Sequence, residues 1–355
     1  MEHPTIKGRG SAKNIKNRFE KTHYELDDDV VQADPDPEAE LEPSPRTVLL
    51  PDNTRTILSE NDSPDVGFRY SVNAYRGCEH GCAYCYARPT HEYLGLSAGL
   101  DFETKIFVKE KAPELLRERL SHPAWEPQPI AMSGVTDCYQ PIERKLRLTR
   151  GCLEVLAELR NPVVIITKNQ LVTRDLDLLS ELGKLDAALV ALSVTTLDDE
   201  LCGKLEPRTS RPRARLRALE DLSKAGVRTM VMVAPVIPGL TDHEMPAILK
   251  AAADAGASRA AYVTLRLPGA VTPLFQDWLA RHRPDRKERV ESHLRSLRDG
   301  KLNDSTFGKR MRGEGAFAEN LKRTFELFTR KYGLNDSRVE LATHHFQRPG
   351  QLRLF

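Results

Sequence analysis

Three cysteines, Cys78, Cys82 and Cys85, lie within eight residues of the stretch YRGCEHGCAYCYARP, which runs from residue 75 to 89. Thiolates are good ligands for zinc and for iron–sulfur clusters. A structural metal site usually has four protein ligands, whereas a catalytic site keeps one coordination position open. Three clustered thiols without a fourth therefore indicate a metal centre that can also bind a small molecule.

A zinc site would need a fourth ligand, and His80 and His91 are the nearby candidates. Zinc sites of this kind usually pair two cysteines with a second pair downstream. Downstream of the loop, Cys138, Cys152 and Cys202 are each isolated. Two hypotheses follow from the residues: an open iron–sulfur site, or a zinc-stabilised nucleic-acid-binding module without catalysis. An electron carrier with a closed cluster is disfavoured because a fourth cysteine is missing.

The composition limits the class of protein. The chain has 355 residues, of which 40% are hydrophobic, and this is enough for a large core. No apolar run follows a basic start, and no stretch approaches 18 consecutive apolar residues, so neither a signal peptide nor a transmembrane helix is expected. Six cysteines in a chain this long do not suggest a disulfide framework. We therefore expect a cytoplasmic protein.

Charge and hydrophobicity divide the chain into four parts. Residues 1–45 are charged and Pro-rich, and we expect a disordered leader. We expect a folded core over 46–275, a helical extension over 276–340 and a tail over 341–355. The last 75 residues carry eighteen lysines and arginines against ten acidic residues. This excess fits contact with an acidic polymer such as nucleic acid, and it fits solvated helix faces equally well.

The core alternates strand and helix patterns. Short β-branched runs occupy residues 68–75, 129–135, 162–168, 187–196, 228–237 and 259–267, with helical patterns of 12–20 residues between them. This rhythm predicts parallel βαβ units of an α/β fold, in which ligands bind at the carboxyl ends of the strands. The polar or turn-forming residues at those ends are Thr136, Asp137, Thr167, Lys168, Ser193, Thr195, Pro238 and Gly239. The cysteine loop follows the first strand, so it is expected on the same face.

The Cys-x3-Cys-x2-Cys spacing, with Tyr84 just before the last cysteine, resembles the signature of the radical SAM superfamily. Within that superfamily the chain is similar to the spore photoproduct lyase-related proteins over about residues 55–275, and more weakly to about residue 330. The stretches that carry the resemblance are NDSPD, YRGCEHGCAYCYARPTHEYLGL, DFETKIFVK, TDCYQPIER, IITKNQLVTRDLDLL, SVTTLD, LEPRTSRPRARLRALEDLSKAG, APVIPGLTD, RLP and FGKRMRGEG.

The resemblance implies an open, partial (β/α)6 TIM-like barrel with a helical C-terminal extension. It implies a [4Fe-4S] cluster held by Cys78, Cys82 and Cys85, with the free iron bound to S-adenosylmethionine (SAM). One electron, from a donor such as flavodoxin or ferredoxin, would cleave SAM and give methionine and a 5′-deoxyadenosyl radical. The radical would abstract hydrogen from an unknown substrate, with nucleic acid as the first candidate by family analogy.

The resemblance also implies contacts with SAM at the strand ends. Thr136 and Asp137 lie in the SGVTD stretch, which would contact the methionyl amino group, and Lys168 and Ser193 would hold the carboxylate and the ribose. Tyr84 and the turn over 236–239 would flank the adenine. The complete set of expected SAM-binding residues is Tyr84, Thr136, Asp137, Lys168, Ser193, Glu206 and Arg213. The alternative for each is an ordinary polar residue at a strand end.

One departure from the lyase limits the analogy. The lyase uses a cysteine as hydrogen donor to the product radical, and this chain has Gly134 at about the corresponding position. Photoproduct repair is therefore not implied. Cys138 is close in sequence, and it is either a radical relay or a small buried apolar residue.

The chain ends in QLRLF, which resembles the short peptide by which bacterial replication and repair proteins bind the sliding clamp. Gln351 would be a polar anchor, and Leu352, Leu354 and Phe355 would enter an apolar groove. The alternative is a tail that packs on its own domain.

Overall fold

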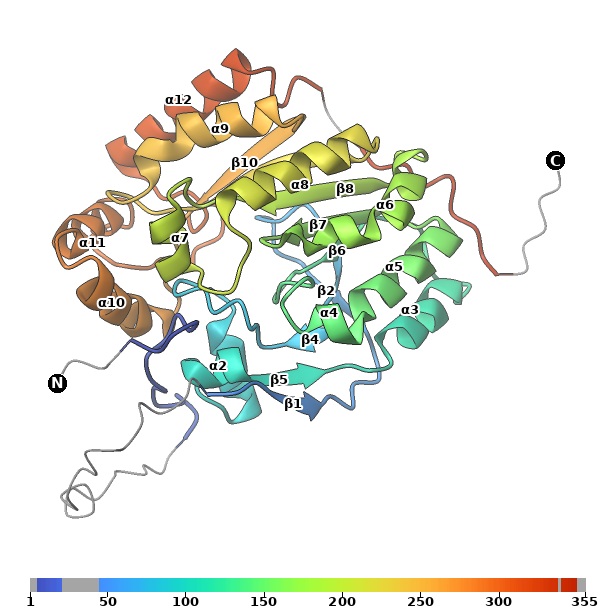
Figure 1. Cartoon of the computed structure of the whole chain (residues 1–355), viewed down its shortest axis with the longest axis horizontal. Coiled ribbons are helices and arrows are strands. Elements are labelled where there is room, and N and C mark those ends of the chain that lie inside the picture. The colour runs from blue at the N-terminus through green and yellow to red at the C-terminus, as the bar shows by residue number, and fades with distance from the viewer. Residues whose placement is uncertain (1–4, 21–44, 338–339, 350–355) are drawn as a thin grey trace.

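The computed structural model describes residues 5–20, 45–337 and 340–349. Its centre is a seven-stranded sheet with the order β10-β9-β8-β7-β6-β3-β2 (Figure 1). The strands are β2 (Leu58–Glu60), β3 (Tyr70–Val72), β6 (Ile130–Met132), β7 (Val163–Thr167), β8 (Ala188–Ser193), β9 (Arg228–Val236) and β10 (Arg259–Thr264). Six of them are parallel, and β2 is antiparallel to β3. The six parallel strands are those predicted from the sequence, and the α/β fold class is confirmed.

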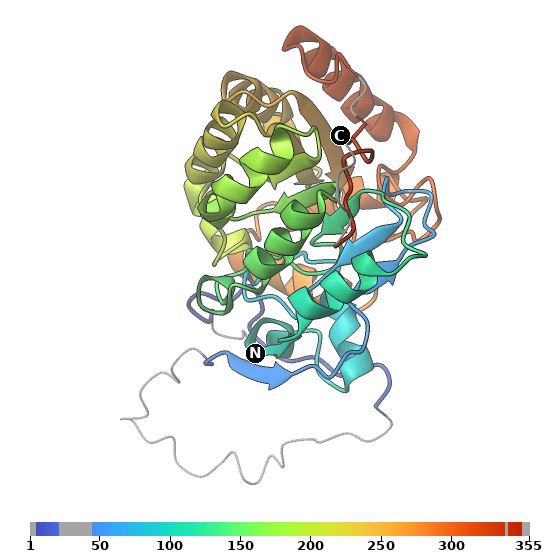
Figure 2. The same cartoon turned by 90° about the vertical axis from the view of Figure 1, so that its right-hand side faces the viewer.

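Helices cover the outer face of this sheet (Figures 1 and 2). They are α3 (Ala112–Ser121), α5 (Leu148–Leu159), α6 (Leu176–Gly183), α8 (Pro212–Lys224) and α9 (Met245–Asp254). Helices α8 and α9 are followed by Gly226 and Gly256, which both have a positive φ, +79° and +86°. That left-handed conformation is easy only for glycine, and it ends each helix just before the next strand.

A second, three-stranded sheet supports the cysteine loop. Its order is β1 (Val48–Pro51), β5 (Lys105–Val108) and β4 (Tyr75–Arg76). The cysteine loop leaves β4 and is followed by a short 3-10 helix, η1 (Arg88–Leu94), and by α2 (Leu100–Thr104). The loop is therefore enclosed by local structure as well as by the main sheet.

Three longer helices follow β10: α10 (Val271–His282), α11 (Lys287–Ser296) and α12 (Gly315–Lys331). Phe325 of α12 packs on Tyr262 of β10 with 4.8 Å between ring centroids. Short helical segments complete the chain: α4 (Glu143–Leu146), η2 (Gln170–Asp175), α7 (Asp199–Leu205) and η3 (Asp242–Glu244). Among the described residues, no helix is both long and apolar enough to cross a membrane.

The two ends of the described chain differ from the expectations. Residues 5–20 were expected to be disordered, and this is wrong, because Arg9, Ser11 and Asn17 are buried. The prediction of disorder was based on the low apolar content of this segment. It did not take into account the hydrogen bonds that the polar groups of these residues make with the folded core. Residues 1–4 and 21–44 of the expected leader lie outside the described residues, as does the expected clamp-binding peptide over 351–355.

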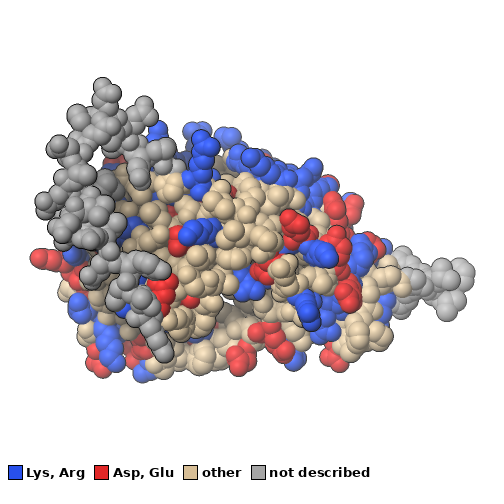
Figure 3. Space-filling model, turned by 90° about the horizontal axis from the view of Figure 1, so that it is seen from below, with Lys and Arg blue, Asp and Glu red and all other residues tan. Residues whose placement is uncertain are grey.

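Acidic and basic residues are mixed on the surface. On the face shown in Figure 3, lysines and arginines alternate with aspartates and glutamates.

Candidate active site

The cysteine loop lies between β4 and η1, and its thiols are free. Cys78 and Cys82 are buried and Cys85 is half-buried. The backbone of the loop is bonded to its surroundings: Cys78 N–H donates to Phe102 O at 2.9 Å, and Ala83 N–H donates to Leu205 O at 3.0 Å. These bonds attach the loop to α2 on one side and to the end of α7 on the other.

A buried arginine holds the loop from behind. The Arg88 side chain has no solvent exposure, and it donates to the carbonyls of Cys82, Ala98 and Gly99 and to the carboxylate of Glu103. All five guanidinium N–H groups have an acceptor, which is the full capacity of arginine. Because the Glu103 carboxylate is also fully buried, the charge of Arg88 is compensated within the protein.

The N-terminal segment completes this support. Gly10 and Ser11 donate their backbone N–H groups to the Glu103 carboxylate at 3.1 and 2.9 Å, and Arg9 donates to the Glu103 carbonyl at 2.8 Å. A Cβ atom on Gly10 would lie only 1.8 Å from the Gly81 carbonyl oxygen. Residues 9–11 thus lie directly on the cysteine loop, and only glycine fits at position 10.

The surroundings of the three thiols act on their pKa values in both directions. Burial raises the pKa of each of the three cysteines; Glu206 also raises the pKa of Cys82, and Lys168 opposes this. The backbone N–H groups of Asp137 and His80 lower the pKa of Cys78 and so favour its thiolate. Metal binding requires thiolates and would supply the compensating charge. Within the described ranges, no three His, Cys, Asp or Glu side chains are close enough to hold one metal ion.

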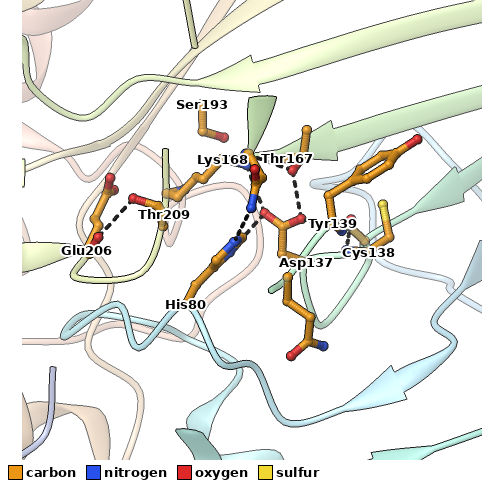
Figure 4. A network of polar contacts seen from close by, with 12 residues as sticks. His80, Asp137, Cys138, Tyr139, Thr167, Lys168, Ser193, Glu206 and Thr209 are labelled. Carbon is orange, nitrogen blue, oxygen red and sulfur yellow. Dashed lines mark hydrogen bonds and ion pairs between the residues drawn. The ribbon is translucent and has the colours of Figure 1, made fainter. Parts of the chain in front are cut away.

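Asp137, which follows β6, connects the cysteine loop to the end of β7 (Figure 4). Its carboxylate accepts hydrogen bonds from Thr167 Oγ1 at 2.7 Å and from Lys168 N–H at 2.8 Å, and its Oδ2 lies 3.3 Å from His80 Nδ1. Burial alone would raise its pKa, but His80 and these two donors lower it to about 2. Asp137 is thus an ionised link between strand ends.

His80 extends the same network to a third loop. Its Nε2 lies 3.2 Å from Asn169 Nδ2, and Asn169 Oδ1 accepts from Ser210 Oγ at 3.0 Å. The carbonyl of His80 accepts from Arg208 N–H at 3.2 Å. From the sequence, His80 was considered only as a zinc ligand, and Asn169 and Ser210 were not identified as site residues.

Tyr84 is fixed by a buried ion pair. Its hydroxyl donates to Glu206, whose carboxylate also pairs with Arg215 and accepts from Thr195 Oγ1 at 2.7 Å. Burial alone would raise the pKa of Glu206, but Arg215 and Lys168 lower it to about 2. The Lys168 ammonium lies 5.8 Å from the centroid of the Tyr84 ring. Lys168 therefore lies between this ion pair and the cysteine loop.

The structure brings most of the expected residues to this face. Tyr84, Asp137, Lys168 and Glu206 are joined by the contacts above, and Ser193 is buried at the end of β8, where its carbonyl accepts from Arg215 at 2.8 Å. Thr136 is buried, and its hydroxyl donates to Tyr75 O at 3.0 Å. Arg213, by contrast, is exposed on α8.

The arginine of α8 that reaches the site is Arg215 instead of Arg213. The two are two positions apart, so on a helix they lie on different faces. Helical periodicity gives the signal that could have identified Arg215, because it shares the buried face of α8 with Pro212, Ala218, Leu219 and Leu222.

Cys138 belongs to the apolar core. It is buried, it packs in the main hydrophobic cluster, and burial raises the pKa of its thiol. Figure 4 shows the thiol on the side of Tyr139, away from His80. This environment favours a small buried apolar residue over a radical relay.

Residues 72–252, about half of the chain, match the sequence profile of the Radical SAM superfamily. The chain belongs to this superfamily. Membership implies an enzyme that uses SAM and an iron–sulfur cluster.

Three relatives illustrate the range of similarity. An uncharacterised protein of Mycobacterium tuberculosis is 41% identical over 220 residues, which cover 61% of this chain and 65% of that protein. An uncharacterised protein of Methanocaldococcus jannaschii is 32% identical over 178 residues, covering 50% of this chain and 64% of that protein. A radical SAM Nα-GlyT isomerase of Pseudomonas phage M6 is 27% identical over 168 residues, covering 47% and 33%. The matches thus span less than two thirds of the length of these relatives.

Among solved structures, spore photoproduct lyase in complex with a dinucleoside spore photoproduct has a similar fold. The TM-score is 0.58 at 18% identity, with 81% of this chain and 80% of the lyase covered. A mutant of the lyase has been solved with AdoMet and the dinucleoside bound, at the same TM-score and identity. At this identity, the likeness shows that the two proteins share a fold.

Proposed function

We propose that this protein is a radical SAM enzyme that reductively cleaves SAM and abstracts a hydrogen atom from a nucleic-acid substrate. The observation that carries the proposal is the set of three free cysteines, without a fourth, at the carboxyl ends of the strands of a radical SAM fold. When bound there, a [4Fe-4S] cluster with SAM supplies a 5′-deoxyadenosyl radical.

The residues of the chain have distinct tasks in this proposal. Cys78, Cys82 and Cys85 would hold the cluster, and Lys168 and Ser193 would hold the carboxylate and the ribose of SAM, which is supported by their location at strand ends near the cysteine loop. Of the other expected SAM-binding residues, Arg213 is exposed on α8, and Tyr84, Thr136, Asp137 and Glu206 have their side-chain polar atoms engaged within the protein. They act mainly by fixing the shape of the site, which keeps water and stray hydrogen donors out.

Two further features of the proposal come from relatives. Nucleic acid as the substrate is supported by the solved complex of the lyase with a dinucleoside, which is an analogy of fold. The electron would come from a small donor protein such as flavodoxin or ferredoxin, as the cysteine loop supplies three ligands and no second redox centre. A cytoplasmic location, where thiols remain reduced, suits this chemistry.

The test is anaerobic reconstitution with iron and sulfide, followed by dithionite and SAM, and chromatography for 5′-deoxyadenosine. We expect about four irons per chain and a product that disappears in Cys82→Ala. Cys152→Ala is the matched control, because Cys152 is a buried cysteine in the middle of α5.

Each contrary outcome is informative. One zinc per chain in place of iron would favour the zinc-stabilised binding module, which the spacing of the side chains does not support. Equal product from Cys82→Ala and the wild type would contradict the assignment of the cluster ligands.

A further inference from the structure

Two arginines beside the cysteine loop have no acidic partner. Arg266 follows β10, and Arg298 follows α11; neither has a carboxylate within ion-pair distance in the described part of the chain. The Nε atoms of both are buried and lack a hydrogen-bond partner. A buried charge without a counter-ion is costly, and each such group in a native protein needs an explanation.

The local charges make the deficit larger. Arg298 is 3% exposed, and burial together with the nearby Arg266 lowers its pKa to about 10. The pKa of Arg266 is lowered by burial and by the nearby Arg310. Two carboxylates act on this group from beyond ion-pair distance. Asp304 raises the pKa of Arg298, and Asp65 raises that of Arg266, although the Asp65 carboxylate is already bonded to Arg310 and to Gly308 N–H. The three arginines Arg266, Arg298 and Arg310 thus outnumber the two carboxylates that act on them, and the group has an excess of positive charge.

The aromatic ring of Tyr86 lies between Arg266 and the cysteine loop in sequence and in contact. Tyr86 comes directly after Cys85, it is 51% exposed, and its ring centroid lies 5.9 Å from the guanidinium carbon of Arg266. Leu265 and Leu267, on either side of Arg266, pack in the same cluster as Cys82 and Tyr84. Arg266 is therefore next to the cluster-binding loop, on the side where the strands end.

A second arginine–aromatic pair lies beside the first. Met311 Sδ is 3.5 Å from Arg266 Nη1, and the neighbouring Arg310 lies 4.4 Å from the centroid of Phe307, which is 55% exposed. Exposed rings alternating with guanidinium groups are the means by which proteins bind single-stranded nucleic acids, since bases stack on the rings and phosphates contact the cations.

We propose that Arg266, supported by the charge of Arg298, binds a phosphate of a single-stranded or extruded nucleic-acid segment whose base stacks on Tyr86. This inference rests on the proposed function for the location of the chemistry, and it adds the surface that would bring a nucleotide to the cysteine loop. A base on Tyr86 would lie next to a cluster ligand, so the bound nucleotide would be adjacent to the site of SAM cleavage.

The test is fluorescence anisotropy with a labelled single-stranded DNA of about 12 nucleotides, since such sites span about 4–16 nucleotides. A labelled RNA of the same sequence is used in parallel. In Arg266→Gln we expect at least tenfold weaker binding and a salt slope smaller by about one. Arg217→Gln is the matched control, because it removes one charge from an exposed arginine of α8. Tyr86→Leu should weaken binding about five- to a hundredfold.

Thermal unfolding separates ligand binding from a structural role. Arg266→Gln removes a repulsive charge next to Arg298, so its melting temperature should be equal to or higher than that of the wild type. A lower melting temperature with unchanged oligonucleotide binding would mean that Arg266 is structural, and the proposal would be wrong.

Two other results would also overturn it. If Arg266→Gln weakens SAM binding and leaves the oligonucleotides unaffected, the anion at this site is the carboxylate of SAM. If the wild type binds neither DNA nor RNA but still produces 5′-deoxyadenosine, the radical SAM function stands and the nucleic-acid surface does not.

Discussion

Two arginines near the cysteine loop, Arg88 and Arg266, differ in how many of their N–H groups the protein itself satisfies. Arg88, behind the loop, has an acceptor for every N–H group and an ion pair with a fully buried carboxylate. Arg266, which contacts Tyr86, has a buried Nε without a hydrogen-bond partner. No carboxylate of the described residues lies within ion-pair distance of it. A saturated guanidinium can only hold the protein together, whereas an unsaturated one is available to a ligand.

The strongest test of this difference is removal of the Arg88 partner. Glu103→Ala removes the counter-ion of Arg88 and the acceptor of the Gly10 and Ser11 N–H groups. We expect a loss of about 3–5 kcal/mol in the free energy of unfolding. The measurement is denaturant unfolding under anaerobic conditions.

Glu158→Ala provides the control for this prediction. Glu158 pairs with Arg117 at 2.6 Å, but both side chains are about half exposed, so the loss should be below about 1 kcal/mol. Equal losses in the two variants would mean that the Arg88 pair is no more important than a surface pair.

A second test separates the N-terminal segment from the rest of this support. In Gly10→Ala, the new methyl group would collide with the Gly81 carbonyl, so either residues 9–11 leave the loop or the loop moves. We expect iron content after reconstitution to fall below half of the wild-type value. We also expect faster hydrogen exchange over residues 78–85, which can be measured without iron.

Gly67→Ala is the matched control, since a Cβ there meets no atom within 4 Å and its φ is not positive. Normal iron loading in Gly10→Ala would show that the N-terminal segment does not position the cluster ligands.

The smallest effect is expected at Asp65, whose partner Arg310 lies near Arg266. Asp65→Asn weakens the ion pair with Arg310 across segments that are far apart in the sequence, and the pair is partly exposed. We expect hydrogen exchange over residues 303–313 to become a few times faster, without a change in iron loading. Asp62→Asn, at an exposed neighbouring position, should have no effect. A large loss of stability would mean that Asp65 supports the fold in the same way as Glu103 does.

Much of the fold could be predicted from the sequence, because local patterns carry it. The six parallel strands, their helices and the stops at Gly226 and Gly256 depend on alternation, helical periodicity and glycine conformation. The second sheet was not predicted, since β4 has only two residues and pairs with a strand 30 residues away.

The site could be predicted in part. The cysteine spacing located the loop, and the strand ends located Thr136, Asp137, Lys168 and Ser193. Their roles could not be read in the same way, since whether a carboxylate such as Glu206 is free or paired depends on a residue of another segment, here Arg215 on α8.

By itself, the sequence determined the class of chemistry and the succession of strands along the chain. Both depend on cysteine spacing and hydrophobic period, which are properties of neighbouring residues. Only the tertiary structure decided that residues 9–11 lie on the cysteine loop and that Arg215 and not Arg213 enters the site. It also decided that, among the described residues, Arg266 has no ion-pair partner and that its Nε has no hydrogen-bond acceptor. The physical reason is that burial and charge pairing are set by residues distant in the chain, and the saturation of a guanidinium group is visible only when all of its neighbours are in place.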